Sequence, residues 1–197
     1  MTHHMSRTPA GPSTVVDTDA VWVRLEASLK SVNLTAWKAL RPGTTEARLG
    51  VLERTLGKPL PDDLRATLLR HDGQEDEGES LFPWGFGSGW NNGHFVLMPV
   101  EVIEQHWREW HESVASGAFD GNTTVPDVGV RQGWWCAGWV PFACDHGGTH
   151  LCVDLDPAAG GVVGQVVVVW HDDHRRLLVA GSLTELLSKL CAHYESR

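Results

Sequence analysis

Two cysteines and two histidines stand symmetrically about Gly148 in the middle of an apolar stretch. They are Cys144, His146, His150 and Cys152. If position 144 pairs with 152 and position 146 with 150 in a hairpin, the two-residue period of a strand places all four side chains on one face. Two thiolates and two imidazoles then form a ligand set for Zn²⁺.

A flat ladder holds these four groups as a rectangle, whereas zinc requires a tetrahedron. We therefore expect no metal or other cofactor, and interpret the cysteines as buried thiols and the histidines as exposed residues of the turn. A disulfide between Cys144 and Cys152 fits the same hairpin, but a reducing compartment argues against it.

The segment from His171 to Arg176 combines acids, bases and cations within six residues. Apolar runs on both sides predict strands, so this composition is typical of a polar hairpin loop rather than of a catalytic site. Asp154 and Asp156 are interpreted similarly, as residues that begin and cap a turn. The sequence has no phosphate-binding glycine loop and no nucleophile elbow, so we expect a protein that is not an enzyme.

An acidic run followed by aromatic residues occupies 72–93, which we call the acidic-aromatic loop. The acidic run attracts basic partners over long distances, and aromatic side chains supply the contacts that dominate many interfaces. The predicted partner-binding residues are Glu75, Asp76, Glu77, Trp84, Phe86 and Trp90. The alternative is that the aromatic side chains fold over the sheet as a lid on the core.

The chain of 197 residues carries 25 acidic and 16 basic residues, a net charge of −9. This charge repels nucleic acids and anionic lipid surfaces and favours a basic protein partner. No apolar segment is long enough to enter a membrane, and residues 1–16 form a polar stretch that lacks a secretory signal. We expect residues 1–16 to be a disordered arm and the protein to be cytoplasmic.

Residues 17–197 are expected to form one α+β domain. Apolar spacing and capping residues predict helices that begin near positions 18, 45, 61, 100 and 183, with an irregular connection over 33–43. Alternating and apolar runs predict strands on both sides of the Asp145–Gly148 turn, then over 162–170 and 177–179. In the last helix, Ser182 and Glu185 form a capping box.

Three blocks of residues resemble the SUKH superfamily of fungal cell-wall-assembly regulators and bacterial immunity proteins. The first block contains Glu53, Leu56-Gly57, Leu60-Pro61, Asp63-Leu64 and His71-Asp72-Gly73. The second runs from Trp139-Val140-Pro141-Phe142-Ala143 through Asp145 and Gly147-Gly148 to Asp154-Leu155-Asp156-Pro157 and Gly164-Gln165-Val166. The third is Val179-Ala180 and Ser182 with the leucine-rich helix that follows.

The resemblance implies a mixed, mostly antiparallel sheet with helices packed mainly against one side, and binding of proteins rather than catalysis. Our leading hypothesis is an immunity protein that binds and neutralises a toxin. The alternative is a scaffold or regulator in cell-wall or envelope synthesis, and a hypothesis of another class is a small zinc-dependent protein that uses the 144–152 hairpin.

Overall fold

The computed structural model describes residues 17–75, 79–87, 89–90 and 93–197, so the expected arm over 1–16 lies outside the described residues. The helices are α1 (Thr18–Val32), α2 (Leu34–Ala39), α3 (Glu46–Leu56), α4 (Asp62–Arg70), α5 (Val100–Ala115) and α6 (Leu183–Glu195). The strands are β1 (Val96–Leu97), β2 (Val125–Pro126), β3 (Trp139–Cys144), β4 (His150–Asp154), β5 (Val166–Val169) and β6 (Arg175–Ala180). Within these ranges, no helix combines the length and apolar character needed to cross a bilayer.

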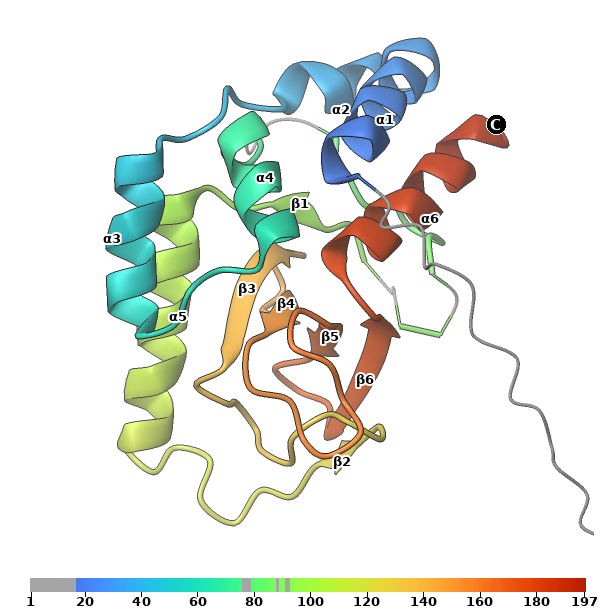
Figure 1. The fold of residues 1–197 in the computed structure, drawn as a ribbon. Helices are drawn as coiled ribbons and strands as arrows, with labels where there is room; N and C mark the ends of the chain where they lie inside the picture. Colours follow the sequence, from blue (N-terminus) through green and yellow to red (C-terminus); the bar gives the residue numbers. More distant parts are fainter. Residues whose placement is uncertain (1–16, 76–78, 88, 91–92) are drawn as a thin grey trace, which may run out of the picture.

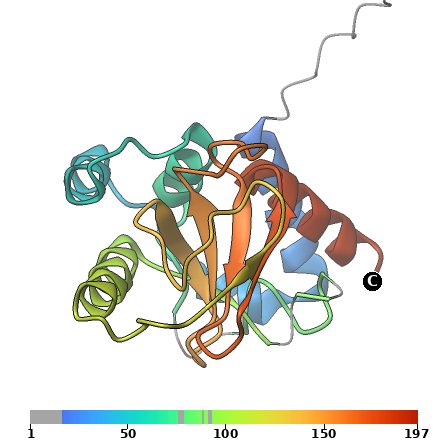
Figure 2. The ribbon, with the colours of Figure 1, turned by 90° about the horizontal axis from the view of Figure 1, so that it is seen from below.

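The strands form one sheet in the order β1-β3-β4-β5-β6-β2 (Figure 1). All neighbours run antiparallel except β2 and β6, which are parallel. Seen from below, the sheet stands in the centre, with α3 and α5 on one side of the view and α6 on the other (Figure 2). The prediction of a single α+β domain with a mixed, mostly antiparallel sheet is confirmed.

The central strands bury side chains on both faces. On β5, Val166 and Val168 belong to the large core shared with the helices, whereas Val167 and Val169 belong to a smaller cluster on the opposite face. Residues from α1, α3, α4, α6 and the first turn of α5 complete the large core. Most helices therefore cover one face, and the second face is covered by the segment 117–138 and the later turns of α5.

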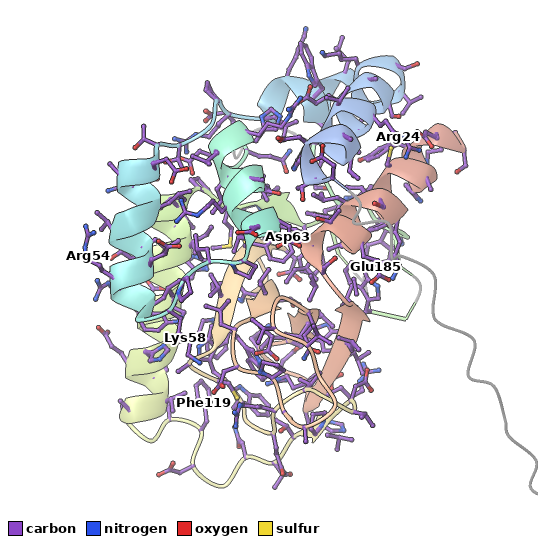
Figure 3. The ribbon with its side chains drawn as sticks, in the orientation of Figure 1. Arg24, Arg54, Lys58, Asp63, Phe119 and Glu185 are labelled. Atoms are coloured by element: carbon purple, nitrogen blue, oxygen red, sulfur yellow. The ribbon has the colours of Figure 1, made fainter. Side chains whose placement is uncertain are left out.

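Several helix ends follow the predicted capping chemistry. Thr45 accepts a hydrogen bond from the backbone N–H of Arg48, and Ser182 accepts one from Glu185. Glu185 in turn accepts from the N–H of Gly181 rather than from that of Ser182, so the return bond of the predicted capping box reaches one residue before the N-cap of α6. Figure 3 shows Asp63 at the start of α4 beside the start of α6, where its carboxylate accepts from the N–H of Thr184.

Some predicted boundaries were wrong. The expected connection over 33–43 contains α2, because the side chain of Asn33 caps the N–H of Ala36 and begins a new helix. The third apolar run becomes a strand only at Val166, since Val162 and Val163 are exposed by 63% and 64% in the turn before it. The two-residue strands β1 and β2 were not predicted because they are too short to show an alternating pattern.

A buried polar network closes the turn between β4 and β5. Gln165 Nε2 donates to the carboxylate of Asp154 at 3.0 Å and to the carbonyl of Gly129 at 2.9 Å, and its Oε1 accepts from the N–H of Val162. The other Asp154 oxygen accepts from the N–H of Asp156 at 3.0 Å. The interpretation of Asp154 as a structural turn residue fits these contacts.

Replacing Gln165 with leucine is expected to lower the free energy of unfolding by about 2–4 kcal/mol, because it leaves several buried polar groups without a partner. Urea denaturation measures this loss. Gln132→Leu is the matched control, since Gln132 is exposed, and it should change the free energy of unfolding by less than about 0.5 kcal/mol. Equal effects of the two substitutions would contradict the importance of the network.

Candidate functional site

Two adjoining pockets form a groove between the acidic-aromatic loop, β1, α5 and the turn 145–149. The first has a volume of about 480 Å³ and the second about 500 Å³. Val96 and His146 line both pockets, so the two are neighbours, and we call them together the histidine groove. Its polar lining residues are Asn33, Arg41, Gln74, Glu75, Glu79, Ser80, His94, His106, His146, His150 and Arg197.

Gln74 holds the acidic-aromatic loop against β1. Its side-chain oxygen accepts hydrogen bonds from the N–H groups of Leu81 and Leu97, both at 3.0 Å, and its amide donates to the carbonyl of Glu79. Asp72 caps the start of α5 through the N–H of Val100 at 2.8 Å. These contacts set the positions of two walls of the groove, the loop and the helix.

The aromatic residues of the loop divide into two groups. Trp84 lines the groove and is 60% exposed, with its ring centroid 6.2 Å from that of His94. Phe86 is only 5% exposed, and Trp90 packs against it and against the core residue Phe95. Trp84 therefore has the exposure that an interface needs, whereas Phe86 and Trp90 act as the lid of the alternative interpretation.

The acidic residues of the loop lie near the same groove. Glu75 lines the first pocket and forms a 3.8 Å ion pair with Arg41, and Glu79 lines the second pocket. Asp76 and Glu77, which were also predicted to bind a partner, lie outside the described residues. The structure thus places Glu75 and Trp84 of the predicted set along one groove.

Sequence reasoning missed the histidine pair at the base of the groove. His106 Nδ1 lies 2.8 Å from His150 Nε2, and the two rings meet nearly at right angles. His150 was expected in an exposed turn but is 3% exposed, because it is the first residue of β4 and contacts Trp110 and Trp135. Burial, together with a smaller contribution from His106, lowers the pKa of His150 to about 4.

The strand register on which the zinc hypothesis depends was wrong. Cys144 lies opposite His150 across the turn 145–149, and Cys152 lies opposite Pro141, beyond a bulge between Pro141 and Ala143. Cys144, His146 and His150 line the histidine groove, whereas Cys152 is fully buried in the smaller cluster. In the part of the chain that the structure describes, no three His, Cys, Asp or Glu residues are arranged to hold a metal ion.

The polar hairpin after β5 is shorter than predicted. Arg175 and Arg176 already belong to β6, and Arg176 is completely buried. Its guanidinium donates to the carbonyls of Trp134 and Asp173 and lies 4.9 Å from the centre of the Trp134 ring. Burial lowers the pKa of Arg176 to about 10, and the contacts identify it as part of the cover of the second sheet face.

An open mixed sheet with helices gathered mainly on one face defines an α+β domain. Comparison with family models makes the assignment specific. The chain belongs to the SMI1 / KNR4 family (SUKH-1), whose model matches residues 43–189.

The chain is similar to fungal proteins that are named as regulators. It is 28% identical over 179 residues to the cell wall biosynthesis/cell cycle regulator smi1 of Schizosaccharomyces pombe, covering 85% of this chain and 34% of that protein. It is 28% identical to the glucan synthesis regulatory protein of Neurospora crassa, with coverages of 80% and 34%. For the cell wall assembly regulator SMI1 of Saccharomyces cerevisiae, identity is 23% and the coverages are 68% and 32%. The chain thus spans about a third of the length of these relatives.

Alanine substitutions in the acidic-aromatic loop should distinguish the exposed Trp84 from the buried Phe86 by their effect on stability. Trp84→Ala is expected to change the free energy of unfolding by less than about 0.5 kcal/mol, because its ring is largely in solvent already. Phe86→Ala should cost about 3 kcal/mol, because it leaves a cavity beneath Trp90. Urea denaturation of both variants checks the division, and a large loss for Trp84→Ala would contradict it.

The buried His150 should make stability depend on pH. Its pKa is depressed from 6.5 to about 4 in the folded protein, so the unfolded chain binds more protons between these values. The stability contributed by neutral His150 is therefore complete above pH 6.5 and is lost as the pH falls toward 4, by about 3 kcal/mol. Urea denaturation between pH 6.5 and pH 4 should show that the free energy of unfolding depends less on pH in His150→Gln than in wild type. Equal pH dependence in the two proteins would contradict the assignment.

Proposed function

We propose that this chain is a non-enzymatic protein-binding domain that regulates cell-wall or envelope synthesis, and that the histidine groove is its binding surface. The single observation that carries the surface assignment is Trp84, a large aromatic side chain left 60% exposed beside the histidine groove. Exposed aromatic residues of this kind are frequent sites of concentrated binding energy.

The regulatory part of the proposal is supported by the family and by the names of the fungal relatives. These names favour regulation over our initial immunity hypothesis. Since the chain covers only about a third of each relative, the activity of the whole fungal proteins enters here as part of the proposal.

A basic partner segment suits the net charge of the chain. Glu75 and Glu79 line the groove beside Arg41 and Arg197, and the sequence between the two glutamates adds Asp76 and Glu77 in a chain of net charge −9. This charge attracts a cationic segment, and the Trp84 ring offers it a surface for cation–π contact. The same acidity also fits an immunity protein that covers a basic toxin, which is therefore the second candidate function.

We also propose that the domain acts in the cytoplasm. Cys152 and Cys191 are buried thiols, the state that a reducing compartment maintains.

Affinity capture from the source cells, with mass spectrometry, tests both candidates. We expect wild-type protein to capture a protein of cell-wall or envelope synthesis, and the affinity for that purified partner to fall about tenfold or more in Trp84→Ala and in Glu75→Lys. A captured toxic enzyme instead would establish the immunity function and exclude the regulatory one.

Val128→Ala and Glu112→Lys are the matched controls, because both positions are exposed and outside the groove. Both controls should bind the partner as the wild type does. If the controls weaken binding as strongly as the groove variants, or if the groove variants bind normally, the histidine groove is not the binding surface.

A further inference from the structure

The His106–His150 contact permits only one proton between the two rings. The facing nitrogens are 2.8 Å apart, a hydrogen-bond distance, so one nitrogen must donate and the other must accept. A neutral pair satisfies this condition. One further proton on the outer nitrogen of the donor ring also preserves it, but protonation of both rings places two N–H groups against each other and breaks the contact.

The pair connects two walls of the histidine groove. His106 is on α5, and His150 begins β4 directly after the turn 145–149. The same turn carries His146, which lines both pockets, and holds it in a left-handed conformation with φ of 58°. A change in the distance between the two rings therefore moves a wall that both pockets share.

Charged and titratable groups approach the pair from every side of the groove. They are Glu109 on α5, Cys144 on β3, Asp145 and His146 in the turn, His171 after β5, and Arg41 and Glu75 across the first pocket. The carboxylate of Asp145 already accepts from the N–H groups of Gly147 and Thr149. Glu109 and Asp145 favour protonation of the pair, whereas His146 and His171 oppose it.

We propose that the His106–His150 pair is a proton-operated latch on the histidine groove, closed while the rings share one proton and open when both are protonated. As a control of partner binding, this latch rests on the proposed function. Opening adds positive charge at the base of the groove and separates α5 from the turn, so acidification disfavours a basic partner through charge repulsion and through loss of groove shape.

Nuclear magnetic resonance of the full chain tests the latch without any partner. In wild-type protein, long-range ¹H–¹⁵N spectra should show one ring proton shared by His106 and His150 at pH 7. On acidification toward the His150 pKa of about 4, that signal should disappear while the amide signals of Gly147, Gly148 and Thr149 shift together. His106→Gln removes one titrating ring, so these amide shifts should be largely lost in this variant.

His111→Gln is the matched control, because His111 is on the same helix and stacks on Trp107 rather than on His150. It should retain the wild-type shifts. Identical pH-dependent shifts of the turn in wild type and His106→Gln, or an absence of shifts in wild type, would overturn the latch.

A second measurement links the latch to binding. Affinity for a groove-binding partner should fall by about twofold or more between pH 7 and pH 4 in wild type, because about half of His150 is protonated at pH 4, and by a smaller factor in His106→Gln. Equal pH dependence in both proteins would show that binding is not controlled by the latch. Failure to find a partner would count against the proposed function. The latch would then be tested by the nuclear magnetic resonance measurement alone, which needs no partner.

Discussion

The sheet must be covered on both faces, and this requirement organises the rest of the molecule. All residues of β3, β4 and β5 are buried, and along β5 the side chains alternate between the large core and the smaller cluster. Helices cover one face because they supply regular apolar stripes. The other face is covered by an irregular segment rich in tryptophan, whose large rings exclude water without regular backbone structure.

The position of the histidine groove follows from the path of the chain between the elements that cover the two faces of the sheet. The acidic-aromatic loop leaves the helical side, is fixed by Gln74 against β1, and leads into α5, which contacts both clusters. The loop, the helix and the β3–β4 turn meet at one corner of the sheet. The recess between them is lined by polar side chains together with apolar residues of β1 and the start of α5.

Local signals in the sequence predicted the helix caps and the order of the central strands, because Thr45, Ser182 and the apolar runs act over a few residues. The histidine pair escaped prediction because His106 and His150 are 44 positions apart and meet only through tertiary packing. The register of the hairpin also escaped prediction, because Cys144 pairs with His150 across the turn and a bulge lies at Pro141–Ala143. Trp84 is exposed and Phe86 is buried although both lie in the same loop, so this difference could not be predicted from the local composition.

Both margins of the sheet are closed to strand addition in the described part of the chain. The outer side of β1 is occupied by backbone and side-chain hydrogen bonds from Gln74 and Phe82. At the other margin, β2 is two residues long and ends in Pro126, which has no N–H to offer. Short or occupied margins of this kind limit pairing with the edge of another sheet and so protect a sheet from templating aggregates.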